Sequence, residues 1–284
     1  MTNNNELPTS EKDYKKVIAF WGVGSVGKTT MALTFAQTLA RISDLKVGLL
    51  DFAVITPSIH LFLDTEDQES MIEFVLKSWQ DNFSYKDILE ENAFRTKDVP
   101  NLLYWTGLTK HPELIEKLGL NQAKSIISEL SEIVDILFID VQSDTLIIPT
   151  DISLKMATDV IAIVDQNRNV IENTAKWLNN LYVRQVGINK FHLLINQYSD
   201  KAMYTKEKIE KNLGVPLIGT IPAIPKVKYD NLTVTLDSLL KYREIADHVK
   251  EALLKLHKEI PLKKKGAKRF RLFSFSNKKD SDSI

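Results

Sequence analysis

The amino-acid sequence contains no cysteine among its 284 residues and only five histidines. Without cysteine, the chain has no disulfide framework, no thiolate metal site and no cysteine nucleophile. The histidines are His60, His111, His192, His248 and His257, and no two of them share a short metal-ligand spacing such as i, i+4. These absences exclude thiol chemistry and argue against a dedicated transition-metal site.

Long apolar runs are also missing. No stretch of about 18 consecutive apolar residues occurs, so the sequence predicts no transmembrane helix. The first residues, MTNNNELPTSEKDYKK, are polar and lack the apolar segment of a secretory signal. We therefore expect a cytoplasmic protein.

The charges of the chain balance overall but not locally. There are 37 Lys and Arg residues and 37 Asp and Glu residues. Residues 262–284 contain eight Lys or Arg and two Asp, a net charge of +6, which leaves a net charge of −6 on the rest of the chain. A basic segment attached to an acidic body suggests an anionic partner, either lipid or nucleic acid.

Short apolar runs alternate with helical patterns along most of the chain. The runs predict buried strands at residues 17–21, 47–51, 101–105, 136–140, 160–164, 191–196 and 215–221. Helical periodicity covers residues 29–42, 70–79, 112–133, 170–181 and 244–257. This alternation predicts an α/β fold with a mainly parallel, twisted sheet and helices on both faces.

The most specific motif is the segment Gly22-Val23-Gly24-Ser25-Val26-Gly27-Lys28-Thr29, which fits G-x-x-x-x-G-K-[ST]. An apolar strand precedes it and a helix follows, as a phosphate-binding loop requires. Glycines let consecutive backbone N–H groups turn inward around phosphate oxygens, and the positive end of the helix adds to this attraction. Lys28 is expected to reach the β- and γ-phosphates, and the Thr29 hydroxyl is expected to hold Mg²⁺.

Two acidic residues end predicted strands. Asp51 ends the strand VGLLD, and Asp140 ends the strand ILFID. Ligands of open α/β sheets sit at the carboxyl ends of strands, so both carboxylates are candidates to hold Mg²⁺, directly or through water. Each of them could instead serve as a helix N-cap or a surface loop acid.

At the level of motifs, the chain resembles the MinD/ParA group of P-loop ATPases, which includes the FlhG and CpaE/TadZ proteins. The resemblance runs from about Val17 to about Leu256 and is carried, in this order, by VIAFWGVGSVGKTTMALTFAQTLA, VGLLDFAVITPSIHLFL, VPNLLYWTG, ILFIDVQSD, ATDVIAIVDQNRNVIENTAKWL, LLINQYSD and LGVPLIGTIPAIPKV. Taken together, the motifs are specific for the superfamily and weaker for a subgroup. We expect a P-loop ATPase domain at 17–258, and composition and charge predict a flexible segment at 1–16 and a basic aromatic tail at 259–284.

The resemblance implies ATP and Mg²⁺ as cofactors and assigns site residues by matching positions. Nucleotide-binding residues are Gly22, Gly24, Ser25, Val26, Gly27, Lys28, Thr29 and Thr30, with Asn196 and Pro222 beside the adenine. Thr29, Asp51 and Asp140 are the implied metal-binding residues, and Lys28, Asp51 and Asp140 are the implied catalytic residues.

Three positions depart from the pattern of the group. Val23 stands where the group has a lysine that reaches across an ATP-bound dimer, and Ser25 replaces the glycine that follows two positions later. Ala53 replaces the second aspartate of the D-x-D switch, which orients the attacking water. Losing one such electrostatic group costs on the order of 10²–10³ in rate, so we expect slow hydrolysis with nucleotide binding retained. These departures favour the CpaE/TadZ-like end of the group.

The chain offers other polar residues that could replace the missing groups. Gln142 and Asp144 follow Asp140 and are candidates to place water, because glutamine has that role in other P-loop enzymes. The alternative is that both are ordinary polar residues of a switch loop. His60 is better explained as a helix surface residue than as a base.

The segment 262–275 combines cations with aromatic and apolar side chains. Such segments bind anionic lipid through charge and apolar insertion, and MinD-like proteins carry a membrane-targeting segment in a similar place. Nucleic acid has less support, because no reading module appears in the sequence. The tail could also be a solvated extension or an arm that docks on a partner protein.

The function expected from these features is a nucleotide-dependent localisation or partitioning switch. It would act through an ATP-dependent homodimer, and at the inner face of the membrane if the tail binds lipid. A fully active partition-type ATPase and a pseudo-ATPase scaffold remain the alternatives.

Overall fold

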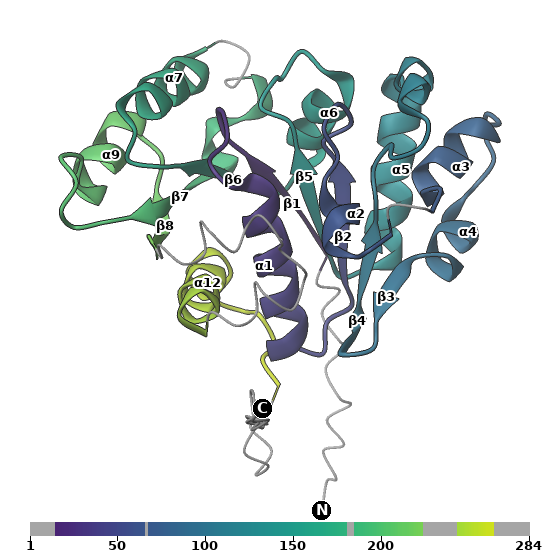
Figure 1. Ribbon diagram of the computed structural model, residues 1–284, viewed down its shortest axis with the longest axis horizontal. Coiled ribbons are helices and arrows are strands. Elements are labelled where there is room, and N and C mark those ends of the chain that lie inside the picture. Colours follow the sequence, from purple (N-terminus) through teal and green to yellow (C-terminus); the bar gives the residue numbers. More distant parts are fainter. Residues whose placement is uncertain (1–14, 66–67, 181–184, 224–242, 264–284) are drawn as a thin grey trace, which may run out of the picture.

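An eight-stranded sheet forms the centre of the structure, a computed structural model that describes residues 15–65, 68–180, 185–223 and 243–263 (Figure 1). The strands are β1 (Lys16–Trp21), β2 (Val47–Phe52), β3 (Phe94–Thr96), β4 (Val99–Trp105), β5 (Ile136–Val141), β6 (Asp159–Val164), β7 (Phe191–Tyr198) and β8 (Leu217–Pro222). Their order in the sheet is β3-β4-β2-β5-β1-β6-β7-β8. Strand β3 is antiparallel to β4, and the other neighbouring strands are parallel.

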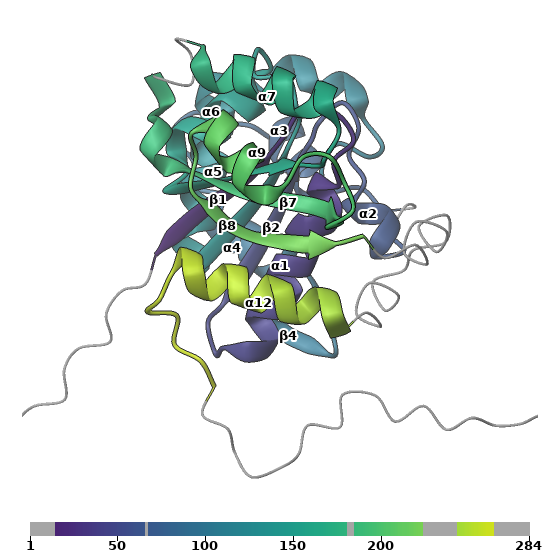
Figure 2. The same ribbon diagram turned by 90° about the vertical axis from the view of Figure 1, so that its left-hand side faces the viewer.

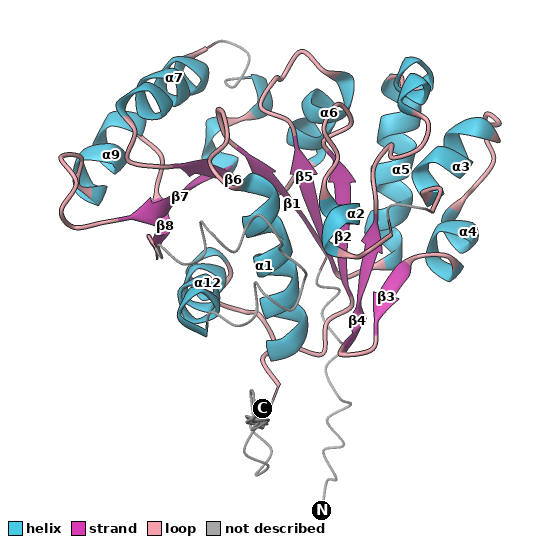
Figure 3. Ribbon diagram, in the orientation of Figure 1, coloured by secondary structure: helices cyan, strands magenta, loops and turns pink. Residues whose placement is uncertain are grey.

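Helices cover both faces of this sheet (Figures 2 and 3). They are α1 (Lys28–Ile42), α2 (Ile59–Phe62), α3 (Met71–Lys77), α4 (Lys86–Glu91), α5 (Leu120–Ile133), α6 (Ile148–Met156), α7 (Arg168–Asn179), α9 (Lys206–Leu213) and α12 (Arg243–Leu256), with 3₁₀ turns at η1 (Pro112–Lys117) and η2 (Ile188–Lys190). The predicted α/β fold with a mainly parallel sheet is confirmed.

The core consists of two apolar clusters, one on each face of the sheet. The cluster beneath α1 and α12 includes Phe35 and Leu253, and the cluster beneath α5 and α7 includes Ile127 and Leu178. Strands β1, β2 and β5 are buried between the clusters, which is why most of their residues are apolar on both faces rather than alternating with polar ones. Helix α1 packs against both the sheet and α12, and residues 31–40 are all buried.

Some sequence-based boundaries were wrong. The single helix expected at 112–133 is divided into η1 and α5, because Gly119 has an extended backbone and precedes the first residue of α5. The strand expected to begin at residue 215 begins at Leu217, after Gly214 ends α9 in a left-handed conformation and Pro216 follows.

The sequence analysis gave no bounds for β3, α2, α4, α6 and α9. Strand β3 has only three residues, and the sequence of α9, KEKIEKNL, has only two buried side chains, so neither gives a clear periodic pattern. Residues 1–14 of the expected flexible segment and residues 264–284 of the expected basic tail lie outside the described residues.

Candidate functional site

The glycine-rich loop lies between the carboxyl end of β1 and the first turn of α1, as the motif predicts. Gly27 has a φ of 87°, a conformation that favours glycine, and a Cβ added there would lie 2.6 Å from Nδ2 of Asn196. A Cβ at Gly22 would lie 2.4 Å from the carbonyl oxygen of Ile163. The loop can therefore approach β6 and β7 this closely only because these two positions carry no side chain.

Lys28 lies beside this loop and is held by it. Its Nζ donates to the carbonyl oxygen of Gly24 at 2.9 Å and to Oγ of Ser143 at 3.0 Å. Burial lowers the pKa of Lys28, and the nearby charge of Asp140 acts in the opposite direction. The lysine thus lies where a phosphate cradled by the loop would meet it.

Ser143 was missed by the sequence analysis. Its Oγ accepts from Lys28 and from the backbone N–H of Gly24, at 3.2 Å, while its carbonyl accepts from Nε1 of Trp21 at 3.1 Å. Only its position three residues after Asp140 could have indicated this role, and that signal does not distinguish it from its neighbours.

The two predicted strand-end acids lie side by side. Asp51 on β2 and Asp140 on β5 are paired in register, and both are buried. Burial raises the pKa of both carboxyls, and the charge of Asp51 further raises the pKa of Asp140. This is the electrostatic environment that a bound cation would relieve.

Asp140 contacts the loop directly. Its Oδ2 accepts a hydrogen bond of 2.5 Å from Oγ1 of Thr29, and its Oδ1 is buried with no hydrogen-bond partner within the described part of the chain. The Ser58 hydroxyl lies 3.4 Å from Oγ1 of Thr29. Partly buried hydroxyl oxygens beside an unpartnered carboxylate oxygen are the kind of oxygen ligands that Mg²⁺ prefers, so the residues fit the ion that the family implies.

Asp51 has a second, structural task. Its Oδ1 accepts from the backbone N–H of Ala53 at 3.2 Å, and its Oδ2 accepts from the N–H groups of Ser58 and Ile59, both at 2.9 Å. Asp51 therefore closes the loop of residues 53–58 and satisfies backbone N–H groups at the start of α2. The alternative role of a capping acid applies to Asp51, in addition to its place beside Asp140.

The two residues assigned to adenine lie at the ends of neighbouring strands. Asn196 near the end of β7 is buried, and its Nδ2 donates to the carbonyl oxygen of Val26 at 2.8 Å. Pro222 ends β8, paired with Tyr198 of β7. The structure thus brings Asn196 against the phosphate-binding loop, with Pro222 one strand further along.

Two of the positions that depart from the group's pattern carry apolar side chains that are at least partly buried. Val23 is half-buried against the apolar cluster on the α5 face, and Ala53 is buried.

The candidate replacement residues lie in the loop that follows β5 and on α2. Asp144 is exposed, and its Oδ1 accepts from the N–H of Leu146 within the same loop. Gln142 faces the loop of residues 53–58 rather than Lys28, and His60 lies half-buried on α2.

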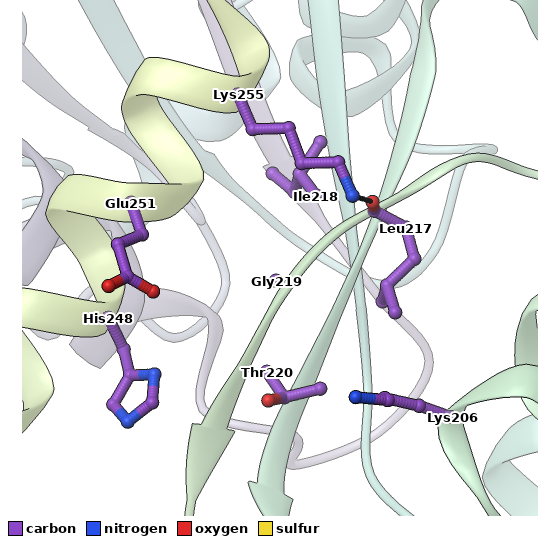
Figure 4. A pocket seen from close by; sticks show the side chains of 8 residues that line it. All are labelled: Lys206, Leu217, Ile218, Gly219, Thr220, His248, Glu251 and Lys255. Atoms are coloured by element: carbon purple, nitrogen blue, oxygen red, sulfur yellow. Dashed lines mark hydrogen bonds between the residues drawn. The ribbon is translucent and has the colours of Figure 1, made fainter.

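A pocket lies elsewhere, between β8 and α12 (Figure 4). Its volume is about 270 Å³, and Lys206 of α9 contributes to its lining. Lys255 of α12 donates from Nζ to the carbonyl oxygen of Leu217 at 2.5 Å, so a lysine side chain covers part of the edge strand (Figure 4). Edge strands are commonly protected in this way against pairing with other chains.

A cluster of charges lies at the amino-terminal ends of β6 and β7, the edge opposite the loop. Asp159 lies 3.1 Å from Nε2 of His192 and 3.3 Å from Nε2 of His257, with Nζ of Lys16 at 3.9 Å. Partial burial raises the pKa of Asp159, but hydrogen bonds from His192, His257 and Thr158 outweigh it and hold the pKa well below its usual range. The cluster anchors the segment that follows α12.

Within the described residues, no helix is both long enough and apolar enough to cross a membrane. The fold, with its glycine-rich loop at the start of α1, defines a P-loop nucleoside-triphosphate-binding protein.

Comparison with known proteins places the chain within this class. A family described as the CobQ/CobB/MinD/ParA nucleotide binding domain matches residues 17–232. The chain belongs to this family, as the resemblance to the MinD/ParA superfamily predicted. Comparison with curated proteins gives no match.

Solved structures support the fold. The chain is similar to a ParA family ATPase from Chlorobium tepidum TLS (14% identity, TM-score 0.70, covering 86% of this chain and 99% of that one). It is also similar to the septum site-determining protein MinD complexed with Mg-ADP from Pyrococcus horikoshii OT3 (18%, 0.68, 86% and 96%). A third similar structure is a putative plasmid partition protein from Borrelia burgdorferi B31 bound to AMPPNP (18%, 0.65, 86% and 99%).

Proposed function

We propose that this protein binds ATP with Mg²⁺ and uses the bound nucleotide as a switch for localisation or partitioning, while hydrolysing it slowly. The observation that carries this proposal is the assembly of Lys28, Thr29 and Asp140 around one loop, beside apolar residues at two positions where the group has charges. The residues that would bind nucleotide and Mg²⁺ are present, whereas the lysine and the aspartate that the group has at positions 23 and 53 are replaced by Val23 and Ala53.

Each residue has a definite task in this proposal. Lys28 would exchange its hydrogen bonds to Gly24 and Ser143 for phosphate oxygens. Thr29 and Asp140 would hold Mg²⁺, which neutralises phosphate charge, with Asp51 acting on the ion through water. Asn196 and Pro222 would lie beside the adenine, and the backbone of residues 22–30 would surround the phosphates.

Slow hydrolysis follows from Ala53 and Val23. A buried methyl group at position 53 cannot orient water, and the half-buried Val23 cannot carry a positive charge to a neighbouring subunit's phosphates. These substitutions also favour the CpaE/TadZ-like subgroup.

Exposed apolar residues near the site support an ATP-dependent homodimer. Ile55 and Leu146, on the loops that follow β2 and β5, are 59% and 83% exposed, and Ile148 is 42% exposed. Large apolar side chains gathered at one edge of a sheet commonly mark a protein–protein contact. A second copy facing this edge would cover them and enclose the nucleotide.

The basic tail, residues 259–284, would attach the protein to an anionic membrane. It would do so from the side of the sheet opposite the nucleotide site, where the parallel strands have their amino-terminal ends. Leu262 forms a β-bridge with Ser43, and Nζ of Lys263 lies 3.6 Å from a carboxylate oxygen of Asp44, just after α1. The polybasic segment therefore begins at the end of α1 that lies farthest from the phosphate-binding loop. A membrane bound there would leave the nucleotide edge open to a partner.

Two measurements test the nucleotide switch. Titration with ATP and Mg²⁺ should show binding, and steady-state phosphate release should be slow. Fast release would favour the fully active partition-type ATPase, and absence of binding would favour the pseudo-ATPase scaffold. The retained Lys28 and Thr29 argue against the scaffold.

A separate experiment tests the tail. Deletion of residues 262–284 should abolish sedimentation with vesicles that contain anionic lipid, and salt should weaken binding of the intact chain, because charges are screened over about 10 Å at 0.1 M. Tail-dependent binding of DNA without vesicle binding would replace the membrane proposal with nucleic acid. Binding to neither would leave a docking arm for a protein.

A further inference from the structure

The loop of residues 53–58 is held by two acceptor side chains, Asp51 on β2 and Gln142 directly after the end of β5. Asp51 of β2 accepts the N–H groups of Ala53 and Ser58, at the two ends of the loop. The tip is held by Gln142, whose Oε1 accepts from the N–H groups of Ile55 and Thr56 at 3.0 and 3.1 Å. Both groups are donors, so only the amide orientation with the oxygen toward them satisfies the contact.

Gln142 is in turn connected to the phosphate-binding loop through its neighbours in the chain. Asp140, two residues earlier, accepts from Thr29, and Ser143, the next residue, accepts from Lys28 and Gly24. Residues 140–143 therefore contact the phosphate-binding loop on both sides of Gln142. A displacement of Lys28 or Thr29 would move Ser143 or Asp140, and with them residues 140–143.

The tip of this loop, residues 55–56, is bound by Gln142 and carries an exposed apolar side chain. Ile55 is 59% exposed, and its backbone N–H is one of the two groups bound by Gln142. The orientation in which Ile55 is presented thus depends on the contact with Gln142. Because its oxygen is already bound to two N–H groups, Gln142 is better suited to hold this loop than to place an attacking water.

We propose that Gln142 is a positioning residue that couples the phosphate-binding loop to the tip of the 53–58 loop, and so sets how Ile55 is presented. The coupling deepens the proposed function, because nucleotide would be its natural stimulus. The contact itself does not depend on that function, so it can be tested without nucleotide.

Two substitutions of similar size separate the acceptor from the shape of the side chain. Gln142→Leu removes the acceptor, and Gln142→Glu keeps an oxygen toward both N–H groups. Amide hydrogen exchange in the full chain should be about tenfold faster at Ile55 in Gln142→Leu, because its N–H loses this acceptor, and near wild type in Gln142→Glu. The N–H of Thr56 should change less, because it also donates to the carbonyl oxygen of Ala53 at 3.0 Å. Gln80→Leu, at an exposed position between α3 and α4, is the matched control and should change neither amide.

The coupling is tested by adding Lys28→Ala, which removes the hydrogen bond between Lys28 and Ser143. Exchange at Ile55 should rise in the single variant Lys28→Ala, and it should rise no further than in Gln142→Leu when the two substitutions are combined. Additive effects would overturn the coupling, and unchanged exchange in Gln142→Leu would overturn the positioning role. Circular dichroism establishes that each variant is folded, and a failure of ATP to bind the wild type would refute the proposed function while leaving these results interpretable.

Discussion

Replacing Asp140 with asparagine should make the nucleotide-free protein more stable. Asp140 is buried beside Asp51, and burial raises the pKa of Asp140 because the charged form loses hydration. Each unit by which a pKa is raised costs the folded state about 1.4 kcal/mol at a pH where the unfolded chain is charged. The pKa of Asp140 rises to about 8 in the folded state, from an ordinary value of about 4, which corresponds to about 5 kcal/mol at pH 7–8.

The geometry around Asp140 allows the substitution. The asparagine oxygen can accept from Thr29, and its amide nitrogen would take the place of Oδ1, which has no hydrogen-bond partner in the described residues. The buried, unpaired amide nitrogen would offset about 1–3 kcal/mol of the gain. We expect the free energy of unfolding to rise by about 3 kcal/mol and Tm to rise by about 5 °C or more, measured without Mg²⁺ or nucleotide at pH 7–8.

Asp51→Asn is the matched comparison, because it removes the same charge from the same pair. Asp51 accepts three backbone N–H groups with its two oxygens. Asparagine has one acceptor oxygen, so at least one buried N–H would lose its partner at a cost of about 1–3 kcal/mol. This variant should therefore gain less stability than Asp140→Asn, or lose stability.

The sign of the pH dependence follows from the raised pKa values. A carboxyl whose pKa is higher in the folded state stabilises the fold fully below its ordinary pKa of about 4, and this contribution is lost as the pH rises. Unfolding by urea between pH 5 and pH 8 should show wild-type stability falling more steeply than that of Asp140→Asn. A lower Tm for Asp140→Asn, or identical pH profiles, would refute the reasoning.

Three further predictions concern Lys28 of the phosphate-binding loop, the uncharged positions 53 and 23, and the charge cluster around Asp159. Lys28→Ala should weaken ATP binding at least tenfold in calorimetry while the fold survives, and unchanged affinity would mean that the site lies elsewhere. Ala53→Asp, alone or with Val23→Lys, should raise steady-state phosphate release above the slow wild-type rate, and no increase would show that another group limits hydrolysis. Asp159→Asn should speed amide exchange in residues 257–263, because it removes the charge that faces two histidines; unchanged exchange there would show that packing alone holds the segment.

The parts of the site that depend on consecutive residues were predictable. The spacing of Gly22, Gly27, Lys28 and Thr29 specifies a turn, a nest of N–H groups and a helix start, and all three are local properties of the backbone. The apolar runs likewise predicted the central strands, because a strand buried on both faces requires apolar residues throughout.

Contacts between distant segments were not predictable in the same way. That Asp51 and Asp140 lie on adjacent strands depends on β5 lying between β2 and β1, an order that the sequence does not state. Ser143 and Gln142 follow Asp140 as ordinary polar residues, and only the folded loops reveal that one contacts Lys28 and the other contacts Ile55 and Thr56.

The sequence by itself determined the class of fold, the phosphate-binding loop and the loss of charge at Val23 and Ala53. Tertiary structure alone decided the second task of Asp51 and the coupling position of Gln142. The physical reason is that backbone conformation and periodicity are set by neighbours in the chain. The partner of a buried polar group is instead set by which distant segment packs beside it and has a free donor or acceptor to offer.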